Sequence, residues 1–333
     1  MEVLLEVKPL VSILIPCFNG APWLHRSIET ALAQTWPNKE IVVLDDGSTD
    51  NSLEIIRRYE SQVRVATQAN GGQNVSRNHL TELSRGEWLV YLDADDELFP
   101  DSVEKKMAYA DHADAIYGAH EVATFVGTEK TRFTILPAIE FEDAVSAAFV
   151  WGFPNTSAFM FRKSALLEAG GWNTAIKNCT DYDLYFRLLL KGKRFRAAND
   201  SMSLYRQWSM NQAVYQDPLR KSRTRLQLIW SAAKELEATG RLTTTRKDAF
   251  ERAAFGVTRT IAQFNREEAV RQHAQLTAWD PGFRPHDCSR SYRLAYRLGG
   301  FEFAEKFAAF GRALNPVKKP QPGIDPQSGL PYV

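Results

Sequence analysis

The first half of the chain alternates short β-branched segments with segments of helical periodicity, and this order limits the fold more than any other feature. Residues 10–15 have the length of a buried strand, and Pro22 then opens a helical pattern. Residues 41–44, 63–66 and 87–92 are further predicted strands with helical patterns between them. Such alternation predicts an α/β fold: a Rossmann-like, mostly parallel sheet with flanking helices.

Acidic clusters follow two of these predicted strands. Asp45-Asp46 follows the second strand, and Asp93-Ala-Asp95-Asp96 follows the fourth. Ligands of such sheets bind at the carboxyl ends of the strands. Asp93 and Asp95, separated by one residue, can share Mg²⁺ or Mn²⁺ and leave positions for phosphate oxygens. The simpler alternative for both clusters is a solvated turn that caps the next helix.

Two more candidates lie at the starts of predicted helices. Asn70-Gly71-Gly72 leads into a helix that carries Arg77. A glycine pair there can let backbone amides approach an anion, although a plain turn is the simpler interpretation. Asp181 begins a predicted helix that ends near Leu190. Its carboxylate either is a helix-start residue stabilised by the helix dipole or serves as a general base. The residues alone leave these alternatives open.

Beyond Asp217-Pro218 the composition changes. The chain becomes rich in Ala, Leu, Arg and Glu, which predicts a helical region over residues 218–315 after an α/β domain over residues 1–217. The predicted helices lie near residues 219–238, 246–279 and 289–313. Prolines and a low apolar content predict a disordered tail over residues 316–333.

Charge and cysteine content limit the function classes. Lys and Arg number 41 against 40 Asp and Glu, so no global basic field indicates a nucleic-acid partner. The three cysteines lie far apart without a CxxC pair, which favours a reducing, cytoplasmic compartment. No uninterrupted apolar segment approaches the roughly 20 residues that cross a bilayer. We therefore expect a cytoplasmic protein that does not bind nucleic acid.

Residues 289–319 combine basic and aromatic side chains. Seven cations stand there among six aromatic residues and only two carboxylates. The commoner outcome for such a helix is that its aromatic residues pack on the preceding α/β domain while its charges are solvated. The alternative is peripheral contact with the anionic inner face of a membrane.

Taken together, the ordered motifs resemble family 2 glycosyltransferases, which have a GT-A fold. The resemblance covers about residues 11–206 and leaves the C-terminal third uncovered. It is carried by Val11–Asn19, Glu40–Asp50, Gly71-Gly72, Ser76-Arg77-Asn78, Tyr91–Asp96, Arg162, Gly170–Trp172 and Asp181–Arg187.

The resemblance implies a nucleotide-binding role for five residues. Pro16 and Phe18 would flank the nucleotide base, and Asp46 would accept a hydrogen bond from it. Arg77 would contact the base or the diphosphate, and Asp93 would lie at the ribose and the metal. The expected donor is a nucleotide-diphospho-sugar, and among these a UDP-sugar.

The resemblance also implies an inverting, metal-assisted transfer of a hexosyl group. Asp95, with Asp93, would ligate Mn²⁺ or Mg²⁺, and Asp181 would deprotonate the acceptor hydroxyl that attacks the anomeric carbon. The expected acceptor is a glycan or lipid-linked glycan in surface polysaccharide synthesis. Two residues depart from many relatives: Thr180 stands where they carry Glu, and Trp208 where they carry a metal-side His. The second departure leaves metal ligation mainly to Asp95.

Two alternative functions remain open. One is a catalytically degenerate GT-A domain that serves as a nucleotide- or glycan-binding scaffold. The other is a sugar nucleotidyltransferase, which needs a Gly-rich, basic N-terminal loop that Asn19–Pro22 does not supply. Retention of the four carboxylates of Asp46, Asp93, Asp95 and Asp181 favours the transferase over the scaffold.

Overall fold

The computed structural model describes residues 8–126, 129–207, 217–285, 287–314, 323–324 and 331–332. The chain divides into two compact units. Within the described ranges, the first unit takes residues 8–142 and 153–207, and the second takes residues 143–152, 217–285 and 287–314 with the two short terminal strands.

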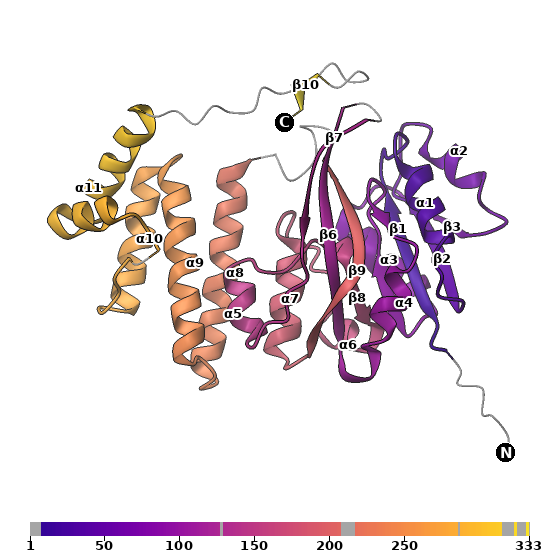
Figure 1. Cartoon of the computed structure of the whole chain (residues 1–333), viewed down its shortest axis with the longest axis horizontal. Coiled ribbons are helices and arrows are strands. Elements are labelled where there is room, and N and C mark those ends of the chain that lie inside the picture. Colours follow the sequence, from indigo (N-terminus) through magenta and orange to yellow (C-terminus); the bar gives the residue numbers. More distant parts are fainter. Residues whose placement is uncertain are drawn as a thin grey trace. The chain divides into compact units, whose positions relative to one another are not determined.

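The first unit is built on a nine-stranded sheet (Figure 1). Its strands run in the order β3-β2-β1-β4-β8-β6-β9-β5, and β7 pairs with β6 outside this path. The strands are β1 (Val11–Cys17), β2 (Lys39–Asp45), β3 (Arg64–Thr67), β4 (Trp88–Tyr91), β5 (Glu97–Leu98), β6 (Ala115–Val126), β7 (Glu129–Leu136), β8 (Phe159–Arg162) and β9 (Phe195–Gln207).

The predicted parallel sheet is confirmed for the first four strands in sequence. β3, β2, β1 and β4 are parallel neighbours. Beyond β4 the sheet becomes mixed, because β8 runs antiparallel to both β4 and β6, while β9 runs parallel to β6.

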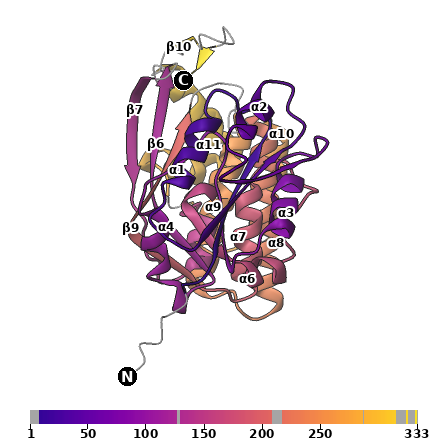
Figure 2. The same cartoon turned by 90° about the vertical axis from the view of Figure 1, so that its right-hand side faces the viewer.

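Helices cover both faces of the parallel part of the sheet, as expected. Ile13 of β1 packs in one core cluster with Leu24, Ile56 and Val103, which belong to α1, α2 and α4. Figure 2 shows α3 on the opposite side of these strands from α1. The helices of this unit are α1 (Leu24–Leu32), α2 (Ser52–Arg57), α3 (Gln73–Leu83), α4 (Ser102–Met107), α6 (Lys163–Glu168) and α7 (Thr180–Leu190), with 3₁₀ turns at Ala110–His112 and Thr156–Ala158.

Strand β9 is missing from the sequence-based expectation. Its pairing with β6 shifts register between Gly118 and Ala119, whose partners are Ala198 and Met202. The three intervening residues bulge toward β6, and a Cβ on Gly118 would lie 2.5 Å from the Ser201 carbonyl oxygen. The polar bulge therefore interrupts a strand that otherwise continues.

The second unit is helical. Its helices are α5 (Ala144–Phe149), α8 (Pro218–Ala238), α9 (Thr244–Ala262), α10 (Arg266–Trp279) and α11 (Arg290–Leu314), and a short antiparallel pair joins β10 (Gly323–Ile324) to β11 (Pro331–Tyr332). The core contains edge-to-face contacts of Phe250 with Trp230 and Trp279, each with centroids 4.8 Å apart. No helix in the described ranges is long and apolar enough to cross a membrane.

The prediction that the C-terminal region is helical is confirmed, but the prediction of one long helix over residues 246–279 was wrong. Residues 246–279 form two helices, because Asn265 caps the second: its Oδ1 accepts a hydrogen bond from the Glu268 amide (3.1 Å). Asp217 caps α8 in the same way, through the Arg220 amide (2.9 Å). Most of the tail predicted to be disordered, residues 316–333, lies outside the described residues.

Candidate active site

The register of the parallel strands brings the acidic clusters to one edge of the sheet. Cys17 at the end of β1 pairs with Asp45 at the end of β2. On the other side of β1, Leu14 pairs with Tyr91 at the end of β4. Asp93 follows two residues beyond Tyr91. The carboxyl ends of β1, β2 and β4 therefore supply neighbouring loops.

Asp46 ties its loop to the start of α3. Its side chain is 2% exposed. The amides of Gly71 and Gly72 donate to Oδ1 and Oδ2 (both 2.9 Å), and Gln68 Nε2 donates to Oδ1 (2.7 Å). The sequence analysis allowed for an anion at the glycine pair, and in this structure the glycine amides bind the Asp46 carboxylate. Because each carboxylate oxygen can accept two hydrogen bonds, Oδ2 keeps acceptor capacity for one more donor.

The preceding residue, Asp45, was not singled out by the sequence analysis as a separate candidate. Its Oδ2 accepts a hydrogen bond from the Ser48 amide (3.2 Å). Its Oδ1 is buried and has no hydrogen-bond partner among the described residues. Only the structure distinguishes these adjacent acids: both are buried, but Asp46 contacts the glycine turn, whereas Asp45 contacts the Ser48 amide of its own loop.

The loop after β4 joins an acidic side chain to a buried arginine. Oδ1 of Asp93 accepts a hydrogen bond from Arg77 Nη2 at 2.7 Å, and Arg77 is 2% exposed. Ser27 of α1 holds the same loop from the other side, since its hydroxyl lies within hydrogen-bond distance of the carbonyls of Ala94 (2.8 Å) and Asp96 (2.7 Å). Asp95, between them, is half-buried. Two predicted residues, Arg77 and Asp93, are thus in direct contact.

Asp96 is an internal support of the acidic loop that the sequence analysis did not identify. It is fully buried and accepts hydrogen bonds from Ser157 Oγ (2.6 Å), Asn155 Nδ2 (3.1 Å) and the Arg206 amide (3.1 Å). Burial, and then the charge of Asp95 beside it, raises the pKa of Asp96 well above its usual range. Arg206 also donates from Nε to the Asp95 carbonyl (2.9 Å).

Trp172 links Arg77 to the region before α7. The Arg77 guanidinium lies over the Trp172 ring, 4.4 Å from its centroid, and Tyr91 meets the same ring edge-on at 5.1 Å. Asn78 accepts from the Trp172 amide and donates to its carbonyl, both at 2.8 Å. A Cβ on Gly171 would lie 2.9 Å from Asn78 Oδ1, so this contact requires glycine there.

Asp181 lies in the first turn of α7, one residue after its start. The preceding Cys179 adopts a left-handed conformation (φ 54°), which turns the chain into the helix. Asp181 is half-buried, and its Oδ1 accepts from the Tyr182 amide (2.9 Å). Burial raises the pKa of Tyr185 well above its usual range; the charge of Asp181 raises it further, whereas Arg77 lowers it. The pKa of Tyr185 therefore depends on the charges of both Asp181 and Arg77.

The predicted base-flanking residues differ in exposure. Pro16 is buried within β1, whereas the Phe18 side chain is 51% exposed. Between them, burial raises the pKa of the Cys17 thiol to about 11, so this cysteine is protonated at neutral pH and is a poor nucleophile. An exposed phenyl ring at a strand end is available for stacking on a planar ligand.

The carboxylates fit a divalent metal only in part. No group of three or more His, Cys, Asp or Glu side chains within residues 8–126, 129–207, 217–285 and 287–314 is arranged to hold a metal ion. Mg²⁺ is commonly held by one or two carboxylates together with water and substrate phosphates. The two acids Asp93 and Asp95 therefore fit a cation that a diphosphate would help to bind. Trp208 lies outside the described residues.

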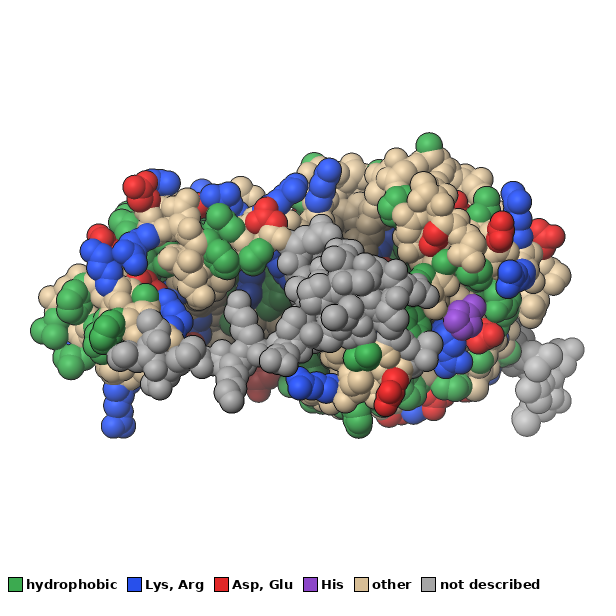
Figure 3. Space-filling model, turned by 90° about the horizontal axis from the view of Figure 1, so that it is seen from above, with side chains coloured by type: hydrophobic (Ala, Val, Ile, Leu, Met, Phe, Trp, Pro, Cys, Tyr) green, Lys and Arg blue, Asp and Glu red, His purple; other side chains and the backbone are tan. Residues whose placement is uncertain are grey.

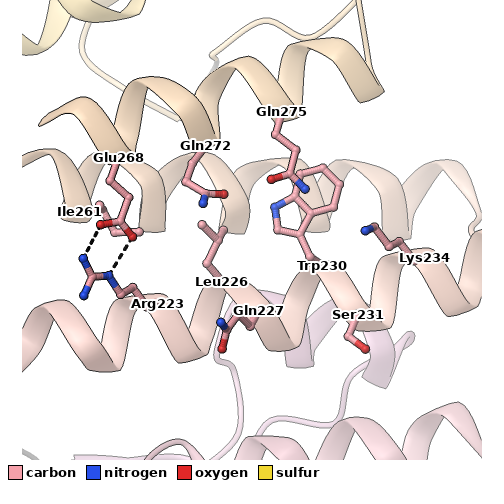
Figure 4. Close-up of a pocket in the computed structure, with 10 residues that line it drawn as sticks. All are labelled: Arg223, Leu226, Gln227, Trp230, Ser231, Lys234, Ile261, Glu268, Gln272 and Gln275. Carbon is pink, nitrogen blue, oxygen red and sulfur yellow. Dashed lines mark hydrogen bonds and ion pairs between the residues drawn. The ribbon is translucent and has the colours of Figure 1, made fainter. Parts of the chain in front are cut away.

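Each unit contains a cavity. A cavity of about 320 Å³ in the first unit is bordered by residues 70–75 and by Thr174, Ile176, Lys177 and Thr180, so it adjoins Asp181 in sequence. A cavity of about 430 Å³ in the second unit lies between α8 and α10, where Arg223 pairs with Glu268 and Gln272 extends toward α8 (Figure 4). None of the predicted site residues borders the second cavity.

Comparisons with protein sequences agree on one family. The family model described as glycosyl transferase family 2 matches residues 12–170. An uncharacterised glycosyltransferase of Nostoc sp. is 30% identical over 216 residues, which cover 58% of this chain and 67% of that protein. The chondroitin synthase of Pasteurella multocida is 31% identical over 191 residues, which cover 56% of this chain and 19% of the synthase. An uncharacterised Rickettsia felis glycosyltransferase is 30% identical, and the match spans 31% of its length.

Solved structures agree on the fold. A mannosyltransferase from Pyrobaculum calidifontis, in complex with GDP-Man and Mn²⁺, matches with a TM-score of 0.54 and 18% identity, over 94% of this chain and 89% of that one. Residues 1–349 of TarS from S. aureus, in complex with UDP, match with a TM-score of 0.52 and 16% identity, over 97% and 98%. These matches confirm the GT-A fold expected from the sequence. At such identities they carry the fold alone.

Proposed function

We propose a function from the premise that the chain belongs to glycosyl transferase family 2, whose model and relatives match it. The protein is therefore a glycosyltransferase. The chain spans about a fifth to a third of the length of several curated relatives, so their activities do not transfer to it as a whole. The donor, the acceptor, the metal and the residue roles below are proposals.

The proposed donor is a nucleotide-diphospho-sugar, and a UDP-sugar in particular. The observation that carries this proposal is the ion pair of buried Arg77 with half-buried Asp93 (2.7 Å) beside Asp95, at the carboxyl end of β4. Together these residues place one guanidinium and two carboxylates at the edge where such sheets bind ligands. The similar TarS structures contain UDP or UDP-GlcNAc and the similar mannosyltransferase contains GDP-Man, so a nucleotide donor is consistent with all of them, and the choice of uridine stays a prediction from the family resemblance.

Five residues would form the nucleotide site. Phe18, exposed at the end of β1, would stack on the base, and buried Pro16 would shape the floor beneath it. Asp46 would accept a base N–H through the free capacity of Oδ2, while its other bonds hold the glycine turn. Arg77 would contact the diphosphate, and Asp93 would lie at the ribose.

Asp95, with Asp93, would hold Mn²⁺ or Mg²⁺ together with the diphosphate oxygens. A bound divalent cation would neutralise the charge that develops on the leaving diphosphate. The protein's part is to keep both carboxylates in place through Ser27, Asp96 and Arg206. A mannosyltransferase of the same fold contains Mn²⁺ with its donor, which is consistent with this assignment.

Asp181 is the proposed general base. It would take the proton of an acceptor hydroxyl, whose oxygen forms a bond to the anomeric carbon of the hexosyl group while the bond from that carbon to the diphosphate oxygen breaks. The nucleoside diphosphate leaves with the bonding electrons, and attack from the opposite side inverts the anomeric configuration. The preceding Thr180 lacks the carboxylate of many relatives, so Asp181 would act without an acidic neighbour on that side.

The proposed acceptor is a glycan or lipid-linked glycan of a surface polysaccharide. Relatives named chondroitin synthase and hyaluronan synthase support a saccharide acceptor. A cytoplasmic location stays a prediction from the cysteine spacing.

Nucleotide binding tests the proposed donor site. We expect UDP to raise the melting temperature in the presence of Mn²⁺, by an amount set by the ratio of ligand concentration to Kd. Asp95→Asn should abolish the metal-dependent part of this rise. Asp101→Asn is the matched control, because the Asp101 side chain is 46% exposed and pairs only with Lys105 among the described residues. A response to none of UDP, GDP, dTDP and CMP would favour the scaffold alternative.

A further inference from the structure

Helix α11 is anchored by one face. Tyr292 and Phe301 are buried there, and His273 of α10 stacks on Phe301 with ring centroids 4.5 Å apart. Glu305, 3% exposed, accepts hydrogen bonds from Arg259 Nε (2.6 Å) and from the Tyr292 hydroxyl (2.8 Å). These two rings pack on α9 and α10 of the helical unit, whereas the sequence analysis expected packing on the α/β domain.

The opposite face of α11 is apolar and open. Five large side chains protrude from it: Leu294, Leu298, Phe303, Phe307 and Phe310, which are 57%, 74%, 48%, 47% and 65% exposed. Single exposed apolar residues are ordinary on a protein surface, but this row continues along a whole helix. The packing expectation was therefore wrong for the three phenylalanines, because their spacing of four and three residues aligns them on the side away from the core.

Two glycines divide this open face into two segments. Gly299 and Gly300 interrupt the helix, and Gly300 has a φ of 71°, which favours glycine. The first segment carries the leucines and the second carries the phenylalanines. Each segment thus presents its own short apolar ridge.

Cations accompany the apolar residues. Arg290, Arg293 and Arg297 are exposed, and none forms an ion pair with a described residue. Arg290 and Arg297 stand four residues before and three residues after Leu294, and Arg293 stands four residues before Arg297, so the arginines form a row beside the leucines on the helix surface. In Figure 3, hydrophobic and basic side chains lie side by side on the surface at the α11 end of the second unit.

We propose that the open face of α11 binds the surface of an anionic phospholipid bilayer. Its leucines and phenylalanines enter the boundary between headgroups and acyl chains, and its unpaired arginines contact lipid phosphates. Charge complementarity favours this occupant: the first segment of α11 carries three exposed arginines and no carboxylate, and the exposed Glu302 of the second segment is paired with Lys306. Rows of protruding apolar side chains suit insertion into the fluid boundary of a bilayer. The proposal is independent of the donor site.

Vesicle binding by the full chain tests this proposal. We expect the protein to float with vesicles of phosphatidylcholine and phosphatidylglycerol, to bind pure phosphatidylcholine much more weakly, and to dissociate as salt rises. Combining Phe303→Ser, Phe307→Ser and Phe310→Ser should abolish flotation. Combining Arg293→Gln and Arg297→Gln should weaken binding on the order of tenfold.

Matched controls separate binding through this surface from nonspecific adsorption to vesicles. Leu167→Ser changes an exposed leucine of α6, and Arg57→Gln with Arg58→Gln changes two exposed arginines at the end of α2. We expect these controls to float like the wild type. Should the triple phenylalanine variant lose its folded circular dichroism spectrum, Leu298→Ser replaces it, since that side chain is the most exposed of the five.

Three results would overturn the proposal. The first is a wild-type protein that stays with the soluble fraction, and the second is a folded triple variant that floats as well as the wild type. The third is a wild-type dimer that does not bind vesicles and becomes a monomer in the triple variant, because the apolar face would then bind a second copy of the chain.

Discussion

The Asp46 carboxylate should hold the glycine turn closed even when no nucleotide is bound. The perturbation that tests this is Asp46→Asn, which keeps the size of the side chain but replaces one acceptor oxygen with an amide donor. In the folded protein Oδ1 faces Gln68 and the Gly71 amide, while Oδ2 faces the Gly72 amide. The new amide must therefore face at least one backbone donor.

The magnitude follows from the three hydrogen bonds. Bonds to a charged group contribute roughly 1.5 to 3 kcal/mol each, and neutral ones about 1 kcal/mol. Asp46→Asn loses the bond to Gly72 and removes the charge from the other two. The free energy of opening the turn should fall by about 3 kcal/mol, which corresponds to roughly a hundredfold change in an equilibrium constant.

Hydrogen exchange followed by mass spectrometry measures this locally. Peptides that contain Gly71 and Gly72 should exchange on the order of a hundred times faster in Asp46→Asn than in the wild type, without nucleotide. Asp45→Asn is the matched control: it removes the same charge from the adjacent residue, whose carboxylate accepts only the Ser48 amide among the described residues. Unchanged exchange at Gly71 and Gly72 in Asp46→Asn would refute this account of the turn.

Three further predictions concern other contacts of the first unit. Asn78→Ala removes both hydrogen bonds to the Trp172 backbone and should lower the free energy of unfolding by about 2 kcal/mol, measured by urea titration. An unchanged urea midpoint would contradict a stabilising role for these two bonds. Arg77→Lys keeps the charge but loses the flat contact with Trp172, so UDP affinity measured by calorimetry should fall on the order of tenfold; equal affinity would exclude the guanidinium from the donor site. Burial lowers the pKa of Lys106 from 10.5 to about 7, so the unfolded chain binds more protons between these values and stability should rise with pH across that window. Lys106→Met should stabilise the protein at neutral pH by a few kcal/mol and flatten the rise of stability with pH. If the slope of stability against pH is unchanged by this substitution, Lys106 is not the group responsible.

The first half of the fold could be predicted because local signals and global packing agree there. The β-branched run of β1 is fully buried, and its parallel register alone brings the ends of β2 and β4 to one edge. The placement of Asp45 and Asp93 at that edge follows from the strand ends. Strand β9 escaped prediction because three polar bulge residues resemble a turn, although Gly118 makes room for them.

The internal partners of the site could not be predicted, because they depend on contacts between distant residues. Nothing in the sequence indicates that Trp172 lies under Arg77 or that Asn78 holds its backbone. Asp96 follows the acidic pair like one more loop residue, yet its burial depends on Ser157 and on the Arg206 amide. On α11, periodicity predicts an aromatic stripe but not that the stripe faces away from the core.

Release of nucleoside diphosphate tests the central proposal most directly. With a UDP-sugar, Mn²⁺ and saccharide acceptors, the wild type should release UDP in an acceptor-dependent way. Asp181→Asn should bind UDP with unchanged affinity and lose transfer by a factor of roughly 10² to 10⁴, as expected when a general base is removed. Asp181→Asn that binds UDP and transfers sugar at the wild-type rate would contradict the assignment of Asp181 as the base.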